Sequence, residues 1–477
     1  MKIIFPIEPN RALREQWLGL MYISAVLKKS GYNPKVIPAD MGLLEKELGN
    51  EPAILGYSTP TYLARYYIDF NRKAKEKFNV FSIFGGPHPT YYPDIINEAG
   101  IDAICLGEGE YAMLDLVERM SNNEPIHDIS NLWVKEKGNE SIYKNPLRPL
   151  LSNLDEVPNP DRSLFHEFKP RWENHIGIMS GRGCPFKCSY CFNHALSELY
   201  GVKGKSFIRK RSVDNVIEEL SELKHNYPNA FFLFWDDIFI IDPNWLKDFS
   251  IKYKSKIAAP YMCNVRANLV NPNVIKYLKE SNCFLVSMGL ESGNEKLRNA
   301  VLKRGMSDEQ ILNASKLIKD AGLKLHTTNI LGIPKGSIDM DIETIKLNIK
   351  AKVDFAFGFI LQPYHGTEIY NIASEEGLTE KTYTGITDFS KPFGYYPYSS
   401  RDPKIKNQIE NLHSLFSFVI IFPIFAPLMK LLIKLPLKKI YLLLNLFSIN
   451  IYWGIKSQYS LRKRIWYQLK SVFSNKN

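Results

Sequence analysis

Cysteine is scarce in this chain: its 477 residues include only six, and Cys105, Cys263 and Cys283 lie far apart among apolar neighbours. Secreted domains held together by disulfides are rich in cysteine, so this usage excludes a disulfide framework and indicates a reducing compartment. The first residues, MKIIFPIEPN, lack the apolar core of an export signal, and we expect them to form a strand. The sequence therefore predicts a cytoplasmic protein in which these three cysteines are buried thiols.

Acidic residues are lacking in one part of the chain only. Residues 401–477 contain thirteen Lys or Arg and two Asp or Glu, a net charge of +11, which equals the net charge of the whole chain. Residues 1–400 therefore carry 48 basic and 48 acidic residues and are neutral overall. With 45% apolar and 23% charged residues the composition is that of a globular protein, long enough for two or three domains. The basic character belongs to the tail.

The tail also lacks a run of about twenty apolar residues, the length that a single membrane span requires. Residues 415–429 are uncharged and mostly apolar, but Lys430 ends this run and later runs are short. Apolar runs broken by Lys, with Trp453 and Trp466 nearby, favour helices in a membrane interface, where anionic headgroups attract basic side chains. The alternative is a helical domain packed on the rest of the protein, with a solvated basic side.

We expect residues 379–477 to be a mainly helical region with a peripheral contact to the inner face of the membrane. Nucleic acid is not an expected partner, because the tail is too apolar for a surface that follows phosphates.

In residues 1–144, short apolar runs alternate with amphipathic segments, which predicts a parallel sheet covered by helices on both faces. Sheets of this kind bind ligands at the turns that follow their strands. Two glycine-rich turns, residues 85–89 (GGPHP) and 107–110 (GEGE), follow predicted strands. Glycine there permits close approach to a ligand, although such turns also close sheets that bind nothing. The polar, proline-bearing residues 145–171 are predicted to be a linker.

Residues 172–378 alternate again between strand and helix patterns, and we count six such units. Six units predict a β/α barrel, complete or partial, with functional residues at the carboxyl ends of its strands. The expected strands are HIGIMS, FFLFWDD, YMCNV, FLVSMGLES, LHTTNILGIP and FAFGFILQP.

The remaining three cysteines lie in GRGCPFKCSYCFN, directly after the first of these strands. Cys184, Cys188 and Cys191 have the spacing C-x3-C-x2-C, and closely spaced thiolates bind soft metals. No fourth cysteine follows closely, although a structural zinc site needs four ligands and His194 could supply the last. Three thiolates on a [4Fe–4S] cluster would instead leave one iron open to a cofactor or substrate. The spacing alone leaves both possibilities open.

This loop resembles the cluster loop of the radical S-adenosylmethionine (SAM) enzymes. The resemblance continues through FWDDIF, VSMGLESGNEKLR, VLKRG, NILGIPKG and QPYHGTEIY, in the order typical of the cobalamin-binding branch of that superfamily. GGPHPTYYP and LGEGE resemble the amino-terminal cobalamin-binding domain of the same branch, so the likeness covers about residues 1–378. It implies an α/β fold: a Rossmann-like, parallel-sheet cobalamin-binding domain, then a partial (β/α)6 radical SAM barrel, then the helical tail.

The resemblance implies that Cys184, Cys188 and Cys191 hold a [4Fe–4S] cluster whose fourth iron is chelated by the amino and carboxylate groups of SAM. One electron, from a donor such as ferredoxin or flavodoxin, then cleaves a carbon–sulfur bond of SAM. The 5′-deoxyadenosyl radical released abstracts hydrogen from an unactivated carbon. The cofactors carry this chemistry, and the protein positions them.

Several further residues match SAM contacts of the family. Glu291 suits the ribose hydroxyls as an ionised acceptor, and Arg266 could pair with the SAM carboxylate, with a structural ion pair as the alternative. Lys335 stands where the family often has glycine, which departs from its pattern. The other implied SAM contacts are Tyr190 and Gly332 with Pro334, near the adenine, and Asp236 and Asp237, near the amino group unless they cap a helix. Substrate contacts are expected at Tyr364, His365 and Thr367.

The cobalamin domain lacks the D-x-H-x-x-G motif whose histidine ligates cobalt, because residues 40–44 are DMGLL. The branch that the chain resembles often lacks this histidine, so its absence argues against a histidine-ligated cobalt rather than against cobalamin. For His88 the alternative is a capping or core histidine. The expected cobalamin contacts are Ser58, Thr59, Gly85, Gly86, His88, Gly107, Glu108 and Gly109.

The function that this resemblance implies is a cobalamin-dependent C-methyltransferase. One SAM would supply the methyl group to cobalamin, and a second would supply the radical that activates the substrate carbon. The apolar tail predicts a hydrophobic substrate such as a lipid, isoprenoid or tetrapyrrole. One alternative is a non-methylating oxidative cyclase like the anaerobic porphyrin ester cyclase; another is a non-catalytic redox or sensor protein.

Overall fold

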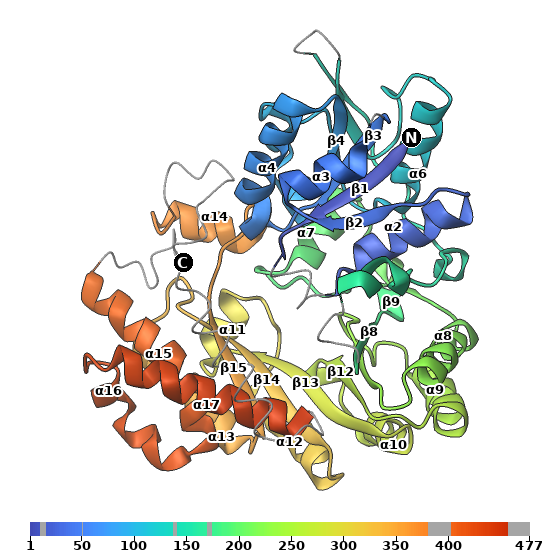
Figure 1. Ribbon diagram of the computed structural model, residues 1–477. Coiled ribbons are helices and arrows are strands. Elements are labelled where there is room, and N and C mark those ends of the chain that lie inside the picture. The colour runs from blue at the N-terminus through green and yellow to red at the C-terminus, as the bar shows by residue number, and fades with distance from the viewer. Residues whose placement is uncertain (10–15, 50, 137–140, 169–173, 380–401, 457–477) are drawn as a thin grey trace.

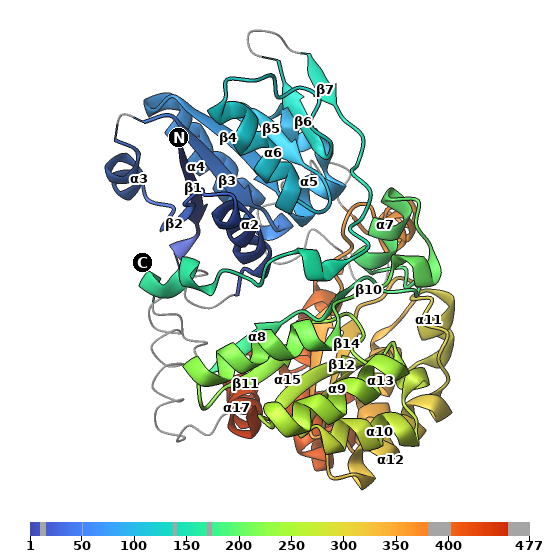
Figure 2. The ribbon, with the colours of Figure 1, turned by 90° about the vertical axis from the view of Figure 1, so that its right-hand side faces the viewer.

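The computed structural model describes residues 1–9, 16–49, 51–136, 141–168, 174–379 and 402–456 (Figure 1). An amino-terminal sheet domain lies against a second sheet domain, and the carboxyl-terminal helices lie along one edge of the second domain. The predicted linker is packed between the two domains (Figure 2). Its Asp161 accepts a hydrogen bond from Ser24 of the first domain at 2.6 Å, and Arg162 donates one to Glu219 of the second at 2.8 Å.

The amino-terminal domain contains a seven-stranded sheet in the order β2-β1-β3-β4-β5-β6-β7. Its first five strands are parallel, as predicted, and β6 and β7 add an antiparallel hairpin. The strands are β1 (Lys2–Ile7), β2 (Lys35–Pro38), β3 (Ala53–Ser58), β4 (Val80–Gly85), β5 (Ala103–Cys105), β6 (Leu132–Lys135) and β7 (Ile142–Lys144). The helices are α2 (Leu18–Lys29), α3 (Met41–Leu48), α4 (Ala64–Lys77), α5 (Pro87–Tyr91) and α6 (Glu110–Ser121).

Of the parallel strands, β1, β3, β4 and β5 lie inside the sheet and are mostly buried, which explains their apolar runs, whereas β2 is an edge strand. Ile54, Leu55, Phe84 and Ile104 are completely buried in one core beneath the helices. The β6–β7 hairpin was not predicted, because β7 has only three residues, none of them buried, and offers no apolar run to recognise.

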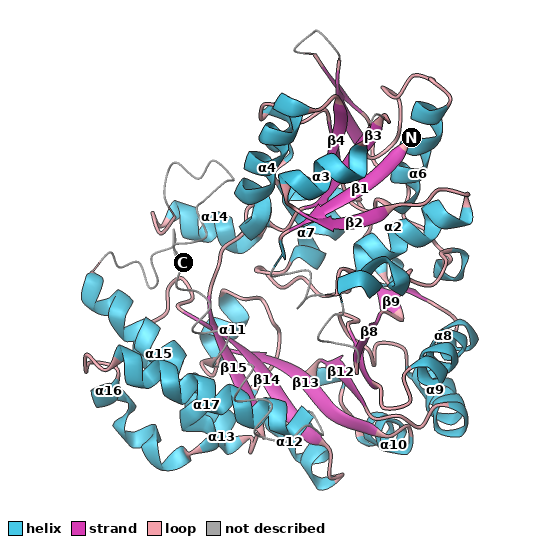
Figure 3. Ribbon diagram, viewed as in Figure 1, coloured by secondary structure: helices cyan, strands magenta, loops and turns pink. Residues whose placement is uncertain are grey.

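The second domain has a six-stranded, all-parallel sheet in the order β15-β14-β13-β12-β11-β8. β8 and β15 are both edges, so the barrel is partial, and the six predicted strands are all present (Figure 3). They are β8 (His175–Ile178), β11 (Phe231–Phe234), β12 (Tyr261–Val265), β13 (Cys283–Glu291), β14 (Lys324–Leu331) and β15 (Phe355–Ile360), beside a small antiparallel pair, β9 (Gly181–Arg182) and β10 (Arg209–Lys210).

Several helices cover the outside of this sheet, whereas α7 and α14 lie on the side of the amino-terminal domain. Ser307 and Gln310 form a complete capping box at α12. The helices are α7 (Phe192–Leu199), α8 (Val213–Asn226), α9 (Pro243–Lys256), α10 (Pro272–Glu280), α11 (Glu295–Ala300), α12 (Asp308–Asp320), α13 (Ile338–Lys350) and α14 (Glu368–Glu375).

The carboxyl-terminal region is helical where it is described, with α15 (Pro403–Ile421), a 3₁₀ segment η8 (Pro423–Leu428), α16 (Met429–Leu432) and α17 (Lys438–Lys456). α15 covers the edge strand β15: the ring of Phe416 lies over Gly358, and Ser417 donates a hydrogen bond to the carbonyl of Ala356 at 2.7 Å. The apolar residues 415–421 therefore pack on the barrel, and the interfacial placement expected for them is corrected.

The rest of the tail is partly outside the described residues. Residues 380–401 and 457–477, with Trp466, and the side chain of Trp453 belong to the parts that are not described. Among the helices of the described ranges, we find none with the length and apolar character needed to cross a membrane.

Candidate functional site

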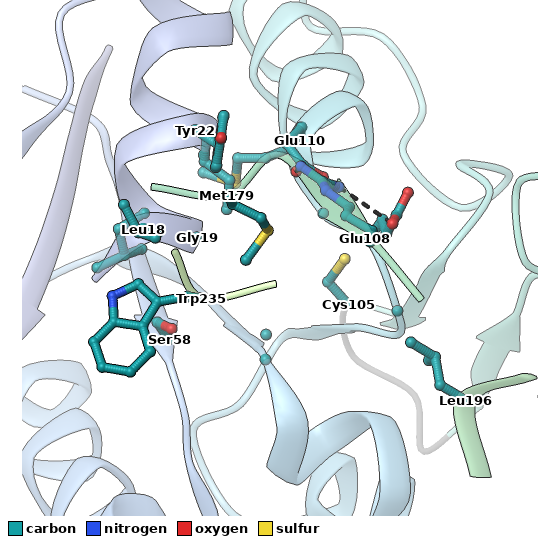
Figure 4. Close-up of a pocket in the computed structure, with 18 of the residues that line it drawn as sticks. Leu18, Gly19, Tyr22, Ser58, Cys105, Glu108, Glu110, Met179, Leu196 and Trp235 are labelled. Atoms are coloured by element: carbon teal, nitrogen blue, oxygen red, sulfur yellow. Dashed lines mark hydrogen bonds and ion pairs between the residues drawn. The ribbon is translucent and has the colours of Figure 1, made fainter. Parts of the chain in front are cut away.

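A pocket of about 330 Å³ lies between the two domains, at the carboxyl ends of strands from both sheets (Figure 4). Turns after β3, β4 and β5 form one wall, and the segment after β8 together with the end of β11 forms the other. The cobalamin-domain residues expected here that do line the pocket are Ser58, Gly85, Gly86, Gly107, Glu108 and Gly109.

The lining suits a flat, largely apolar ring system. Cys105 and Met179 direct their sulfur atoms into the pocket, and Trp235, 43% exposed, forms part of its wall. Histidine is not found among the described lining residues, and Asp40, in the place of the missing motif, caps α3 by accepting the N–H of Leu43 at 2.9 Å. The glycine turns leave room for close approach of a macrocycle. The pocket thus offers a place for the macrocycle of a corrinoid between the domains, and the individual cobalamin contacts stay predictions.

Two expected cobalamin contacts lie outside the lining. Thr59 is buried, and its N–H donates to the carbonyl of Gly85 at 2.8 Å, so it joins the two turns. His88 is completely buried and its ring stacks on Tyr92, with ring centres 4.8 Å apart. Neither ring nitrogen has a hydrogen-bond partner among the described residues, and burial lowers the pKa of His88 to about 4. This is the geometry of the core histidine that we weighed as the alternative.

We predict that His88 makes the protein sensitive to acid. A histidine whose pKa is lowered by folding contributes full stability above its unfolded pKa of about 6.5, and this is lost as the pH falls through the folded value. The loss between pH 6.5 and pH 4 is about 3 kcal/mol. Urea titrations of His88→Phe, which keeps the stacking, should show a free energy of unfolding that falls less over this range. His225→Phe, on the exposed side of α8, should behave as wild type. If the free energy of unfolding falls equally with pH in the wild type and in both variants, the prediction is contradicted.

The acidic residues of the GEGE turn face arginines of the second domain. Glu108 pairs with Arg209 at 2.7 Å and with Arg182 at 3.2 Å, and Glu110 pairs with Arg182 at 2.6 Å. Burial alone would raise the pKa of Glu108, but the hydrogen bond to Arg209 and the charge of Arg182 hold it below its usual value. Tyr200 also accepts the N–H of Glu108 at 3.1 Å. The turn is therefore clamped to the second domain beside the pocket.

Removal of Arg182 should weaken this clamp. Its side chain is only 15% exposed, so Arg182→Gln leaves two mostly buried carboxylates short of a partner and should cost about 2 to 3 kcal/mol of unfolding free energy. Arg65→Gln, which breaks an exposed pair with Asp69, should cost less than about 0.5 kcal/mol. Denaturant titrations that give equal losses of unfolding free energy for the two variants would contradict the stabilising role of the clamp.

The cysteine loop begins directly beside the pocket, because Gly183 lines the pocket and precedes Cys184. The N–H of Cys191 donates to the carbonyl of Cys188 at 3.1 Å, and α7 starts immediately after. Burial raises the pKa of Cys184 to about 12 and that of Cys191 to about 11. These thiols therefore need a bound cation to become thiolates.

Two arginines converge on the sulfur of Cys188, the middle cysteine of the loop. Arg266 and Arg304 donate to the Sγ atom of Cys188 at 3.6 and 3.7 Å, and Arg266 also stacks over the ring of Phe186 at 3.8 Å. Cationic donors around a thiolate offset the negative charge of an iron–sulfur cluster. In the described residues no three His, Cys, Asp or Glu side chains converge tightly enough to hold a single ion. Three cysteines on one loop, with guanidinium donors at the sulfur of Cys188, form a donor set that fits a [4Fe–4S] cluster, in which each thiolate binds a different iron.

Arg304 also links the loop to the expected SAM residues. It donates to the hydroxyl of Tyr190 at 3.1 Å and to the carbonyl of Gly289 at 2.5 Å. Glu291, at the end of β13, is buried with a φ of +67°, a left-handed conformation that costs about 1 to 2 kcal/mol in a residue other than glycine. Burial raises the pKa of Glu291 above its usual value, although the charge of Arg304 and the hydroxyl of Tyr190 oppose this rise. Strain of this kind is typical of functional sites.

The two neighbouring aspartates differ. Asp236 accepts hydrogen bonds from the N–H and hydroxyl of Ser180 at 3.0 and 2.6 Å and pairs with Lys210 at 3.2 Å, which is a structural role. Asp237 lines the pocket and accepts a hydrogen bond from Asn193 at 2.6 Å. A SAM contact at either residue stays a prediction, and the geometry favours Asp237.

The last turns of the barrel show where the other expected contacts lie. Gly332 has a φ of +74°, and its N–H donates to Asp341 at 2.8 Å, so a left-handed turn begins there. The backbone N–H of His365 donates a hydrogen bond to the hydroxyl of Tyr92 at 2.9 Å. The ring of Tyr364 packs on that of Phe192, with ring centres 5.0 Å apart. The turn after β15 thus contacts the first domain.

Sequence reasoning missed several residues that complete the site. Arg304 lies in VLKRG but no pattern marks it, and Tyr91 contacts the cysteine loop from the other domain. The Tyr91 hydroxyl donates to the carbonyl of Phe192 at 2.9 Å, and the two rings stack at 4.4 Å. Such partners are far apart in the sequence, so only the assembled fold identifies them. The residues missed are Arg182, Arg209, Arg304, Tyr91, Phe192, Tyr200 and Trp235.

Comparisons with known proteins agree with this geometry. Residues 178–347 match the model of the radical SAM superfamily, and residues 10–117 match that of the B12 binding domain. An uncharacterized methyltransferase of Pyrococcus horikoshii is 30% identical over 401 residues, which cover 79% of this chain and 84% of that protein. An anaerobic magnesium-protoporphyrin IX monomethyl ester cyclase of Rubrivivax gelatinosus is 24% identical, with coverage of 82% and 74%.

A solved structure shows the same fold. The radical SAM methyltransferase TsrM of Kitasatospora setae, with cobalamin and a [4Fe–4S] cluster bound, superimposes with a TM-score of 0.65 at 13% identity, over 79% of this chain and 76% of that one. The expected cofactors, a [4Fe–4S] cluster, SAM and cobalamin, are thereby confirmed for the chain as a whole. Sequence, pocket and cysteine loop lead to one conclusion: the chain belongs to the cobalamin-binding branch of the radical SAM superfamily and is a radical SAM enzyme.

Proposed function

We propose that this enzyme transfers a methyl group from SAM, by way of cobalamin, to an unactivated carbon of a hydrophobic substrate such as a lipid, isoprenoid or tetrapyrrole. The observation that carries the proposal is the junction of the two sites: the corrinoid pocket reaches Gly183, which is next to Cys184. In this proposal a methyl carrier and a radical source adjoin, which is the arrangement that methylation of an inert carbon requires.

The proposed roles follow the contacts of the side chains. Cys184, Cys188 and Cys191 hold the cluster, and Arg266 and Arg304 offset its charge at Cys188. Glu291 accepts hydrogen bonds from the ribose hydroxyls of SAM. When bound, the cluster and SAM supply the radical and cobalamin supplies the methyl carrier.

The walls of the junction have a separate proposed role, which is to exclude water. The stacked rings of Tyr91 and Phe192, with Tyr364 beside them, bridge the two domains next to the cysteine loop. An aromatic enclosure keeps solvent away from the reacting groups and suits a hydrophobic substrate.

The test uses SAM with a trideuterated methyl group. Anaerobically reconstituted full-length protein is incubated with this SAM, a reductant and a lipid extract of cells that lack the protein. The proposal predicts a product in which a CD3 group replaces one hydrogen of the precursor, so that the product retains all three deuterium atoms. A product that has lost hydrogen or gained oxygen, without label, would contradict methylation.

The second candidate function is an oxidative cyclase, which the 24% identical cyclase relative favours. It would use the same cofactors without methyl transfer, so the label distinguishes the two functions. A non-catalytic redox or sensor role predicts that reduction causes no cleavage of SAM.

The proposed methyltransferase also requires an electron donor, such as ferredoxin or flavodoxin. We propose that the enzyme works at the inner face of the membrane.

A further inference from the structure

Exposed apolar side chains are concentrated at the carboxyl-terminal end of the described chain. Of the seventeen large apolar residues that are exposed in the described residues, nine lie within residues 424–447. Ile424 is 81% exposed, Leu443 63% and Leu431 59%. The nine are Ile424, Phe425, Leu428, Leu431, Leu437, Ile440, Leu442, Leu443 and Phe447, and we call them the apolar patch.

The patch is one surface formed by two segments. Phe422, at the start of η8, stacks on Phe447 of α17 with ring centres 6.3 Å apart, and Phe425 lies 5.3 Å from Phe418 of α15. α15 holds both segments on the barrel by its buried face, where Leu412, Phe416 and Val419 are completely buried. η8, α16 and α17 lie beside α15 at the carboxyl-terminal edge of the second domain (Figure 1), and the exposed side chains of the patch are held there by the buried face of α15.

Basic side chains surround the patch, and acidic ones are missing from the sequence around it. Lys430, Lys434, Lys438 and Lys439 are exposed between its members. From residue 411 to residue 477 the sequence has ten Lys or Arg and no Asp or Glu. Lys430 pairs with Asp339 and Lys438 with Glu410, whereas Lys434 and Lys439 lie exposed.

We propose that the apolar patch docks on the surface of an anionic lipid bilayer. Residues 424–447 carry four lysines and no acidic side chain, and Lys434 and Lys439 lie outside the ion pairs with Asp339 and Glu410. Such a face fits an interface in which apolar side chains enter the acyl region and ammonium groups contact phosphate headgroups. A second copy of the chain fits poorly, because it would bring like charges together across the contact. The inference deepens the proposed function, on which it rests for the hydrophobic nature of the substrate, because a bilayer is where such a substrate is found. Its evidence is the apolar patch and not the catalytic site.

The test is co-sedimentation of the full-length holoenzyme with vesicles of phosphatidylcholine alone or with a quarter of phosphatidylglycerol. We expect sedimentation with the anionic vesicles, reduced at high salt, and little with the neutral ones. Each Lys near the surface contributes about fivefold in affinity, so Lys434→Gln with Lys439→Gln should weaken binding about 25-fold. Ile424→Glu with Leu443→Glu should weaken it by at least about tenfold.

Matched controls come from α9, on a different part of the barrel. Ile251, 60% exposed, and Lys254 lie on that helix, and Ile251→Glu with Lys254→Gln should bind anionic vesicles as wild type does. Iron content of each variant reports correct folding without any assay of methylation. Binding that is equal for all variants, binding that ignores lipid charge, or self-association in ultracentrifugation without vesicle binding would each overturn the proposal. None of these results bears on methyl transfer.

Discussion

Replacing Cys188 by serine is expected to abolish cleavage of SAM, with a fall on the order of 10³-fold or more, as when a group central to the chemistry is removed. Cys188 is buried, and it is the cysteine whose sulfur receives both guanidinium groups, from Arg266 and Arg304. A serine hydroxyl is a poor ligand for iron and leaves both guanidinium groups without their anionic partner. Release of 5′-deoxyadenosine by the reduced, reconstituted protein measures this effect, and its iron content measures loss of the cluster.

The control for this variant is another buried cysteine. Cys283 lies in β13 with its sulfur 4.0 Å from that of Cys263, away from the cysteine loop. Cys283→Ala removes a thiol of similar burial and should retain iron and SAM cleavage. Retention of the cluster in Cys188→Ser, or its loss in Cys283→Ala alone, would show that the cluster ligands have been assigned wrongly.

Gly183→Ala should have the second-largest effect, even though the residue carries no functional group. Gly183 has a φ of +93°, and a Cβ atom there would collide with the backbone carbonyl of Phe207. The left-handed conformation costs about 1 to 2 kcal/mol by itself, and a backbone clash cannot be relieved by a side-chain rotation. Because Gly183 precedes Cys184 and lines the pocket, the shift should displace both the cysteine loop and the corrinoid wall.

The expected result for Gly183→Ala is loss of both bound iron and bound cobalamin, beyond any loss of stability. Gly201 is the matched control, because its φ of +65° imposes the same strain while nothing lies within 4 Å of the added methyl group. Gly201→Ala should cost only about 1 kcal/mol of unfolding free energy and keep both cofactors. Equal cofactor loss in the two variants would show that strain, and not the collision, is responsible.

The sequence sufficed for most of the fold, because parallel strands buried on both faces have continuous apolar runs. All six barrel strands and the five parallel strands of the first domain could be predicted in this way. The hairpin of β6 and β7 could not, since its strands are short and partly exposed. For residues 415–421 hydropathy was ambiguous: an apolar helix packed on β15 and one in a membrane interface have the same composition.

The site was predictable only where chemistry is local in the sequence. The three cysteines and the glycine turns are local motifs, and the structure places both beside one pocket. Arg304 and Tyr91 act through contacts with distant residues, which no spacing rule reveals. For His88 the sequence left both alternatives open, because a histidine after a GG turn has the same sequence whether it faces a ligand or the core. Burial, which decides between these possibilities, is a property of the assembled fold.

The central claim, that this radical SAM enzyme transfers methyl groups, is tested most directly by the products of SAM. Methylation consumes one SAM as a methyl donor, which leaves S-adenosylhomocysteine, and one as a radical source, which leaves 5′-deoxyadenosine. Chromatography of a reaction with full-length protein, both cofactors, reductant and lipid extract should therefore show the two products rising together in about equal amounts. Formation of 5′-deoxyadenosine without S-adenosylhomocysteine would contradict the account.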